Sequence, residues 1–265
     1  MEAYLNQPVE SFVPGLRTPW RNAYTDVRLD GLLRMKSGVR WNEEGWRGLF
    51  SDARAFSNYV RGLRQRVLDF ARRYRKAVPA ENAPYRYSAL DAAVAALVAD
   101  SIAKPTRLTE LLQKDWAAIG AEADAEWGVD KSGTAIGPCC LRATARDLAR
   151  FGLLVLHKGR SPKGQIVPRA WFELAIARQG EIVSGGGMKG GACELEYGYF
   201  WWLRHGRSDF TAFGRNGQFV HVYPDKGVVI VQLSDWSGNT DEERLRCDAL
   251  LAHDALARVA EIVPR

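Results

Sequence analysis

Apolar residues recur three and four positions apart through much of the first two thirds of the chain, which is the spacing of one face of an α-helix. Helices are predicted over residues 29–38, 60–76, 89–104, 144–159 and 168–180. Ser88 and Thr144 precede two of these segments, and Asp91 and Asp147 follow them three residues later, which is the pattern of a capped helix start. Pro168 is typical of a first helical turn. This part of the chain is therefore expected to be helical.

The pattern changes towards the C-terminus. Residues 196–203, 209–213, 217–224 and 227–236 are short segments rich in aromatic and β-branched residues, which predicts strands. Pro-Asp-Lys-Gly at 224–227 is a turn signal and predicts a hairpin. A last helix is expected to be capped by Thr240 and Glu243, with an apolar stripe of Leu245, Ala249, Ala252, Leu256 and Val259. Helices followed by an antiparallel meander under one helix predict an α+β fold.

The net positive charge of the chain raises the question of a nucleic-acid or membrane partner. Lys and Arg number 37 against 31 Asp and Glu, a formal net charge of +6, and much of the excess lies in residues 61–76. Such a patch could bind nucleic acid or an anionic membrane. However, Val60, Leu63, Val67 and Phe70 recur there at helical spacing, which favours a solvated helix with its arginines outward. We therefore expect no nucleic-acid partner and no membrane partner.

The length of the chain limits the number of domains, and its hydropathy bears on where in the cell the protein is expected. A chain of 265 residues is long for one compact domain, so one two-lobed domain or two small ones is expected. No apolar run approaches the roughly 20 residues that span a bilayer. The first residues, MEAYLNQPVESF, show no signal peptide, which favours a cytoplasmic location. The pattern does not indicate an oligomeric state.

Cysteine and histidine patterns do not indicate a metal site or a redox pair. Cys139, Cys140, Cys193 and Cys247 lack C-x-x-C spacing, and we expect them to be buried free thiols in a reducing compartment. The four histidines form no H-E-x-x-H or similar ligand pattern. No metal and no organic cofactor is therefore expected.

Two short motifs match known patterns without the structural context that their chemistry needs, and a third pattern is absent. Residues 185–190, GGGMKG, fit G-x-G-x-x-G but precede a strand, so no helix N-terminus is available for a pyrophosphate. No G-x-S-x-G elbow is present. The only S-x-x-K runs from Ser101 to Lys104. A lysine three residues after a serine on a helix can take the serine proton, but this pair ends a helix before Pro105, so we interpret it as a C-terminus with a favourably placed cation.

Four other blocks, in order, resemble one family. They are LLRMKSGVRWNE, YRYSALD, LRATARDLARFGLLVLHKGR and the pair EYGYFWWL with FTAFGRNGQFVHVYPDKGVVIVQLS. Together they resemble the serine β-lactamase-related hydrolases, closest to the 6-aminohexanoate-dimer hydrolases and the class C-like esterases. The resemblance spans about residues 9–259 and implies one β-lactamase/transpeptidase-like domain over residues 1–265. Its helical lobe would cover about 30–190, and the strands and last helix about 191–265.

The resemblance also implies the site residues. Tyr87 falls on the family's catalytic tyrosine, which carries a proton during acyl transfer. Arg215, Asn216 and Gly217 fall on the counterpart of the β-lactamase K-T-G, and the backbone N–H of Gln218 would be one oxyanion donor. Since Tyr87 lies one residue before a helix N-cap, the helix dipole is expected to lower its pKa, although a neighbouring lysine would normally do most of this.

The sequence departs from the family pattern in two places. Ala89 stands where the family has Ser or Asn, and the family's upstream S-x-x-K is not found in residues 1–30. We therefore expect the N-terminal strands and the nucleophile helix to be missing, as in a C-terminal fragment, a shifted start or a decayed gene. The sheet would be reduced to its last three strands, with an exposed edge.

The expected function follows from these implications. The chain is expected to be a serine hydrolase of small amide or ester substrates by ancestry, with little activity as given. Two alternatives stay open. One is a non-catalytic paralogue that binds a small amide, peptide or cell-wall ligand. The other is a basic nucleic-acid or membrane module built on residues 61–76.

Overall fold

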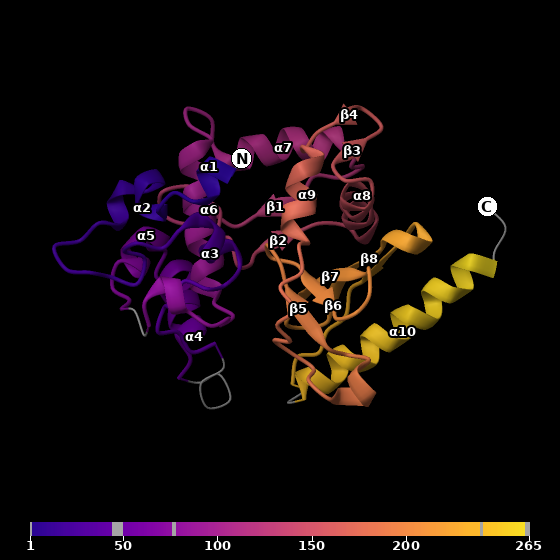
Figure 1. The fold of residues 1–265 in the computed structure, drawn as a ribbon. Helices are drawn as coiled ribbons and strands as arrows, with labels where there is room; N and C mark the ends of the chain where they lie inside the picture. Colours follow the sequence, from indigo (N-terminus) through magenta and orange to yellow (C-terminus); the bar gives the residue numbers. More distant parts are fainter. Residues whose placement is uncertain (1, 44–49, 76–77, 239–240, 263–265) are drawn as a thin grey trace. The chain divides into compact units, whose positions relative to one another are not determined.

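A computed structural model describes residues 2–43, 50–75, 78–238 and 241–262. The chain divides into two compact units, each with segments from two parts of the sequence (Figure 1). The first consists of Met1–Lys114 and Ala125–Arg142, and the second of Asp115–Asp124 and Ala143–Arg265. The expectation of a single domain over residues 1–265 stays a prediction.

Helices make up most of the first unit. They are α1 (Glu2–Leu5), α2 (Val9–Phe12), η1 (Pro14–Leu16), α3 (Leu29–Leu33), α4 (Asp52–Ser57), η3 (Asn58–Gly62), α5 (Val67–Ala71), η4 (Ala80–Asn82), α6 (Ala89–Ile102) and the start of α7 (Leu108–Ala118). A short antiparallel pair, β1 (Glu126–Trp127) and β2 (Leu141–Arg142), completes the unit.

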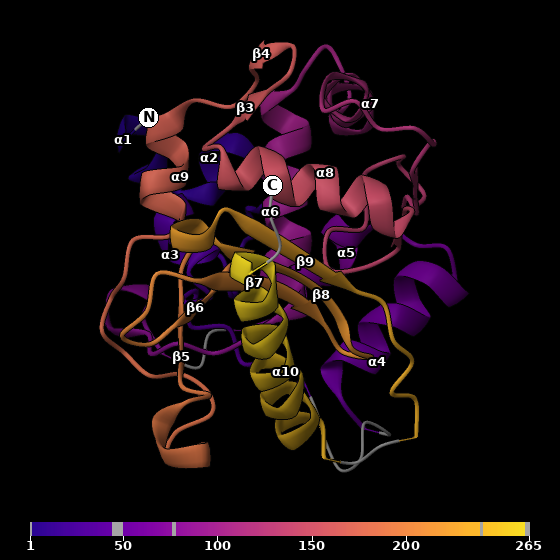
Figure 2. The same ribbon diagram turned by 90° about the vertical axis from the view of Figure 1, so that its right-hand side faces the viewer.

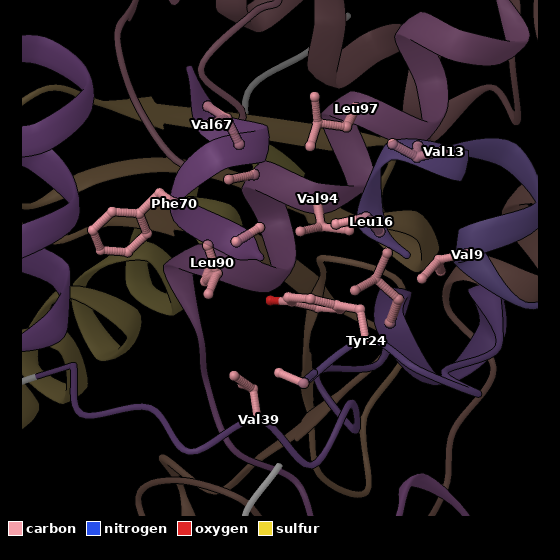
Figure 3. Packing of buried hydrophobic residues seen from close by; sticks show 14 of the residues in the cluster. Val9, Val13, Leu16, Tyr24, Val39, Val67, Phe70, Leu90, Val94 and Leu97 are labelled. Carbon is pink, nitrogen blue, oxygen red and sulfur yellow. The ribbon is translucent and has the colours of Figure 1, made fainter. Parts of the chain in front are cut away.

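Helix α6 is the centre of this unit. Its apolar residues are distributed around the whole helix, as expected for a helix packed on all sides. Leu90 and Val94 are fully buried, and Figure 3 shows them beside the ring of Tyr24 and the side chain of Leu16. The helix begins as predicted, since the Ser88 hydroxyl accepts a hydrogen bond from the backbone N–H of Asp91 at 3.2 Å.

The arginine-rich segment is not one continuous helix. The π-helix η3 ends at Gly62, Arg64 has a φ of 50°, and α5 begins only at Val67. The expectation of an unbroken helix is therefore wrong, because the left-handed conformation of Arg64 interrupts the right-handed helix between its two halves. Leu63, expected on the apolar face, is 66% exposed. Lys76 lies outside the described residues.

The second unit is built on an antiparallel sheet in the order β5-β6-β7-β8-β9. Its strands are β5 (Leu195–Tyr197), β6 (Trp202–Arg204), β7 (Phe210–Gly214), β8 (Gln218–Tyr223) and β9 (Val228–Gln232), and the other elements are β3 (Arg160–Ser161), β4 (Gly164–Gln165), α8 (Ala145–Leu156), α9 (Arg169–Ala175), η5 (Met188–Gly191), η6 (Pro224–Lys226) and α10 (Glu242–Ile262). The α+β fold is confirmed, and so is the hairpin at Pro224–Lys226, but α9 ends earlier than the predicted residue 180.

The sheet has five strands among the described residues, so the expected reduction to three strands is wrong. Four strand segments were predicted from the sequence, and the fifth strand arises because residues 196–203 do not form one strand. Gly198 donates its N–H to the carbonyl of Trp201 at 2.8 Å, and Phe200 has a φ of 59°. This turn divides the aromatic run into β5 and β6.

Helices α8 and α10 cover opposite faces of the sheet. Val220 of β8 approaches Gly152 of α8, where an added Cβ would lie 3.1 Å from the valine methyl group. The next residue, His221, points to the other face and meets His253 of α10. Successive side chains of a strand point to opposite sides, which explains this division. Figure 2 shows α10 lying across the strands.

The buried face of α10 differs from the predicted apolar stripe. Leu256 and Val259 are more than half exposed, whereas Cys247, Leu250 and the polar pair His253 and Asp254 are buried. The sheet presents polar side chains to this helix, so polar residues occupy the inner face. The predicted cap at Thr240 lies outside the described residues.

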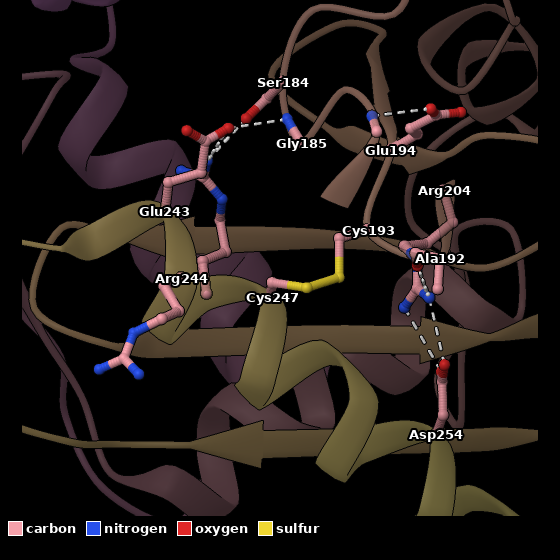
Figure 4. The surroundings of a disulfide bond; sticks show 12 residues. Ser184, Gly185, Ala192, Cys193, Glu194, Arg204, Glu243, Arg244, Cys247 and Asp254 are labelled. Carbon is pink, nitrogen blue, oxygen red and sulfur yellow. Dashed lines mark hydrogen bonds and ion pairs between the residues drawn. A yellow bond between two sulfur atoms is a disulfide. The ribbon is translucent and has the colours of Figure 1, made fainter. Parts of the chain in front are cut away.

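All four cysteines form disulfides, which corrects the expectation of free thiols. Cys193 precedes β5 and is bonded to Cys247 of α10, as Figure 4 shows. Cys139 and Cys140 are bonded to each other. The spacing rules for zinc and redox motifs cannot predict either disulfide, because the two cysteines of one pair are adjacent and those of the other are 54 residues apart.

Within the described residues, we find no helix that combines the length and the apolar character needed to traverse a bilayer.

Candidate functional site

Tyr87 lies at the start of α6, immediately before the N-cap, as the sequence predicted. The neighbouring Arg86 donates its backbone N–H to the carbonyl of Met35 at 2.9 Å. This bond joins the YRYSALD block to the LLRMKSG block, which lie about fifty residues apart in sequence. The first unit therefore brings two of the family-like blocks together around Tyr87.

The electrostatic surroundings of Tyr87 favour the neutral phenol. Desolvation and then the negative charge of Glu43 raise the pKa of Tyr87 to about 12, although 36% of the residue is exposed. The expected lowering of this pKa is wrong. A Glu43 carboxylate oxygen accepts the N–H of Ala89 at 3.1 Å, so Glu43 already occupies the positive end of α6. In this state Tyr87 can donate a hydrogen bond or a proton.

A buried carboxylate, Asp91, lies one helical turn along α6 from Tyr87. One oxygen, Oδ1, accepts hydrogen bonds from the Ser37 hydroxyl at 2.8 Å and the Tyr24 hydroxyl at 3.0 Å. The other oxygen, Oδ2, is buried and has no hydrogen-bond partner among the described residues. Burial raises the pKa of Asp91 to about 7 despite these two bonds. Asp91 therefore titrates near neutrality.

Sequence reasoning identified Asp91 only as a capping residue. Its contacts connect α6 to Tyr24 and Ser37, which are 67 and 54 residues away in sequence. The signal that could have revealed it is the aspartate within an otherwise apolar helix face, next to Leu90 and before Ala93. Such a residue is rarely buried without a specific partner.

The Ser101-to-Lys104 motif is not arranged as a nucleophile and base. The Ser101 hydroxyl donates a hydrogen bond to the carbonyl of Phe12. The helix ends at Ile102, so Lys104 lies beyond it. The interpretation of this motif as a helix end is consistent with both observations.

Arg215, Asn216, Gly217 and Gln218 lie together in the second unit, at the turn between β7 and β8. The N–H of Gly217 donates to the carbonyl of Gly214 at 3.1 Å. The Arg215 guanidinium pairs with Glu242 at 3.1 Å, and the Gln218 side chain donates to the carbonyl of Ser234 at 3.1 Å. The four predicted residues thus form one compact turn, and their role in oxyanion binding stays a prediction.

Gly217 is required at this turn for two reasons. Its φ is +83°, and an added Cβ would lie 2.4 Å from the ring of Trp236. The Trp236 backbone N–H also donates to the carbonyl of Asn216 at 3.2 Å. The indole therefore packs directly on the turn and fixes its shape.

A second polar cluster lies between the sheet and α10. His221 bonds Asp209 at 2.9 Å and approaches His253 at 3.3 Å. Burial lowers the pKa of His221. Burial, and then the repulsion that a protonated His221 would exert, lower the pKa of His253 to about 4. Both imidazoles are therefore neutral at pH 7, which suits hydrogen bonding within a packed interface.

The described residues contain no group of three or more His, Cys, Asp or Glu side chains arranged to hold a metal ion.

A family model describes nearly the whole chain. The model for beta-lactamase matches residues 3–254. Among curated proteins, the 6-aminohexanoate-dimer hydrolase of Paenarthrobacter ureafaciens is 33% identical over 123 residues, which is 46% of this chain and 31% of that protein. The matched stretch thus spans less than a third of that relative's length.

Solved structures share the fold over more of the chain. A Bacillus anthracis protein assigned as a 6-aminohexanoate-dimer hydrolase superposes with a TM-score of 0.80 and 21% identity, covering 98% of this chain and 68% of that one. A penicillin-binding protein from Bacillus halodurans superposes with a TM-score of 0.66 and 12% identity, covering 95% of this chain and 78% of the other. At these identities the likeness establishes a β-lactamase/transpeptidase-like fold.

Proposed function

The chain belongs to the β-lactamase family, and from this premise we propose that it acts on small amide or ester substrates, with Tyr87 as its proton-carrying residue. The observation that carries the proposal is the contact between the two family-like blocks, through the Arg86 N–H and the Met35 carbonyl, at the side of Tyr87. The amide class follows from the curated relative, a 6-aminohexanoate-dimer hydrolase.

The chemistry proposed for Tyr87 follows from its protonation state. A phenol with a pKa of about 12 is neutral at pH 7 and can donate a proton to a leaving group. To act first as a base, it would need a nearby cation to stabilise the phenolate. The Glu43 charge acts in the opposite direction.

The nucleophile is the missing part of this proposal. Residues 1–265 contain one S-x-x-K, and its serine hydroxyl is bonded to the carbonyl of Phe12. We therefore propose that these 265 residues alone turn over substrate slowly or not at all. The turn at Arg215 to Gln218 is proposed to face the substrate carbonyl in an intact site.

Covalent labelling tests the proposal directly. The purified chain would be incubated with a fluorophosphonate and, separately, with a penicillin, and its intact mass measured. We expect no stoichiometric adduct and little hydrolysis of a p-nitrophenyl ester. A stoichiometric adduct mapped to Ser101 would contradict the assignment of that serine to helix structure.

Any residual ester hydrolysis gives a second test. It should fall at least about tenfold in Tyr87→Phe, since a positioned proton donor typically contributes 10²–10⁴-fold. Tyr4→Phe, which changes an exposed phenol, is the matched control. Unchanged turnover in Tyr87→Phe would contradict a catalytic role for this tyrosine.

A non-catalytic binding function is favoured by one specific observation. Tyr87 is held as a neutral hydrogen-bond donor while Ser101 is engaged elsewhere, which suits recognition of an amide without cleavage. Saturable binding of the linear 6-aminohexanoate dimer by calorimetry, without turnover and weakened in Tyr87→Phe, would support this alternative over hydrolysis.

A further inference from the structure

The adjacent pair Cys139–Cys140 is an exposed disulfide. Cys139 is exposed and Cys140 is partly exposed, whereas Cys193 and Cys247 are 2% and 1% exposed. Reagents in solution therefore have access to one disulfide of the chain and not to the other. Thiol–disulfide exchange needs a thiolate to reach a sulfur atom, so access decides which bond reacts.

The backbone around the adjacent pair is held in an unfavourable conformation. Cys140 has a φ of +79°, in the left-handed region that residues other than glycine seldom adopt. Its carbonyl accepts the N–H of Gly128 at 3.0 Å, and a Cβ on Gly128 would lie 3.0 Å from that of Cys140. The covalent ring and this contact together keep Cys140 in the left-handed region.

The same segment is connected to the rest of the first unit. The Trp127 indole N–H donates to the carbonyls of Ile136 and Cys139, at 3.1 and 3.0 Å. The side chain of Cys140 packs against the hydrophobic core that contains α6. Gly137 approaches this helix so closely that an added Cβ would lie 2.3 Å from the carbonyl of Ala92. A change at the cysteine pair therefore acts on Trp127 and on the loop against α6.

We propose that Cys139–Cys140 is a site of reversible thiol–disulfide exchange with small dithiols, and that its reduced form chelates soft, thiophilic species such as trivalent arsenicals. The pair opens while Cys193–Cys247 stays closed. Opening releases Cys140 from the left-handed conformation and loosens the contact between Trp127 and Cys139. This site is independent of the hydrolytic chemistry proposed above.

The dithiol supplies the electrons and protons that the exchange needs. One thiolate of the dithiol attacks the exposed Cys139 sulfur, the bond between Cys139 and Cys140 breaks, and Cys140 leaves as a thiolate that is then protonated. The second thiolate attacks the mixed disulfide and releases Cys139. Two electrons and two protons pass to the protein, and the dithiol becomes a cyclic disulfide. With the reduced pair, phenylarsine oxide forms two As–S bonds and releases one water.

Redox titration of the intact chain tests this proposal. The purified protein would be equilibrated with graded ratios of reduced to oxidised dithiothreitol, quenched with an alkylating reagent, and mapped by peptide mass. We expect Cys139 and Cys140 each to carry one alkyl group at a low ratio of reduced to oxidised dithiothreitol. This ratio should be lower, by a factor on the order of ten or more, than the ratio that opens Cys193–Cys247. Simultaneous opening, earlier opening of Cys193–Cys247, or free thiols at 139 and 140 in the air-oxidised protein would each overturn the proposal.

Two further readouts separate a local switch from general unfolding. Tryptophan fluorescence should change over the same low ratios in the wild type, and the change should be absent in Trp127→Phe and in the double variant C139S/C140S. Phenylarsine oxide should add one equivalent to the reduced wild type, mapped to Cys139 and Cys140, and none to the double variant. A fluorescence change retained in C139S/C140S would refute the local switch. The absence of an arsenical adduct at the two cysteines would refute the chelating site.

Discussion

Arg204 and Asp254 form a buried, two-pronged ion pair between β6 and α10. The guanidinium nitrogens lie 3.1 and 3.4 Å from the two carboxylate oxygens, and Arg204 also donates to the carbonyl of Ala192 (Figure 4). Burial would raise the pKa of Asp254, but the charge of Arg204 and the hydrogen bonds from Arg207 and Tyr223 outweigh it and lower the pKa. Asp254 thus provides the two closest carboxylate contacts of a fully buried arginine, and Asp209 lies 3.6 Å away as a second carboxylate partner.

Replacing Asp254 should strongly destabilise the second unit. Asp254→Ala removes the two closest carboxylate contacts of the buried Arg204 guanidinium and leaves only the Asp209 carboxylate at 3.6 Å. Breaking a buried pair from one side costs about 3–5 kcal/mol. The measurement is the free energy of unfolding by urea denaturation. Asp248→Ala, on the exposed side of the same helix, is the matched control and should change stability by less than about 0.5 kcal/mol. Equal effects of the two substitutions would contradict the pair's importance.

Asp91 should make the stability of the first unit fall as the pH rises. Its folded pKa of about 7 lies above the ordinary 3.8, so the folded state binds an extra proton between these values, and stability is lost as the pH rises through about 7. At 1.36 kcal/mol per pKa unit, the unfolding free energy of Asp91→Asn relative to wild type should grow by roughly 2–4 kcal/mol between about pH 4 and 8.

The difference between variant and wild type isolates Asp91 from other titrating groups. The change of this difference with pH is also free of any constant cost of the unpaired amide nitrogen in Asp91→Asn. Asp124→Asn, an exposed position, is the control and should give a difference that does not vary with pH in this way. A flat difference for Asp91→Asn would show that its carboxyl titrates normally.

Tyr87 should remain un-ionised where ordinary tyrosines titrate. Because its pKa is raised to about 12, the phenolate absorbance at 295 nm of wild type and Tyr87→Phe should coincide over roughly pH 9–11. Circular dichroism over the same range checks that both proteins stay folded. An excess of absorbance in the wild type, centred near pH 10, would refute the neutral phenol.

Gly217 tests the turn that carries the predicted oxyanion residues. Gly217→Ala should cost about 1–3 kcal/mol, because its φ is +83° and the new methyl group would meet Trp236. Gly206→Ala has a positive φ with no atom within 4 Å and should cost only about 1 kcal/mol. Thermal unfolding compares the two. A smaller loss for Gly217→Ala than for Gly206→Ala would contradict the tight packing on the indole.

Local signals in the sequence were sufficient for some elements. Ser88 and Thr144 cap α6 and α8 through bonds to the N–H groups of Asp91 and Asp147, as their spacing predicted. Such bonds form within one helical turn, so neighbouring residues determine them. The family-like blocks likewise predicted the position of Tyr87 at a helix start.

Long-range contacts were not predictable in this way. The burial of Asp91 depends on Tyr24 and Ser37, and that of His253 depends on His221, so no local periodicity reveals either. The apolar stripe predicted for α10 was wrong because polar side chains of β6 and β8 form hydrogen bonds with polar residues on the inner face of the helix. The lowered pKa expected for Tyr87 was wrong because Glu43, far from it in sequence, reaches the same helix end.

The polar inner face of α10 has a kinetic consequence. The part of this face that carries His253 and Asp254 gains little from early hydrophobic collapse, because its partners Arg204, Tyr223 and His221 must first be aligned by the finished strands. Docking of α10 should therefore follow the folding transition state. Substitutions on this face would then accelerate unfolding while leaving the refolding rate almost unchanged.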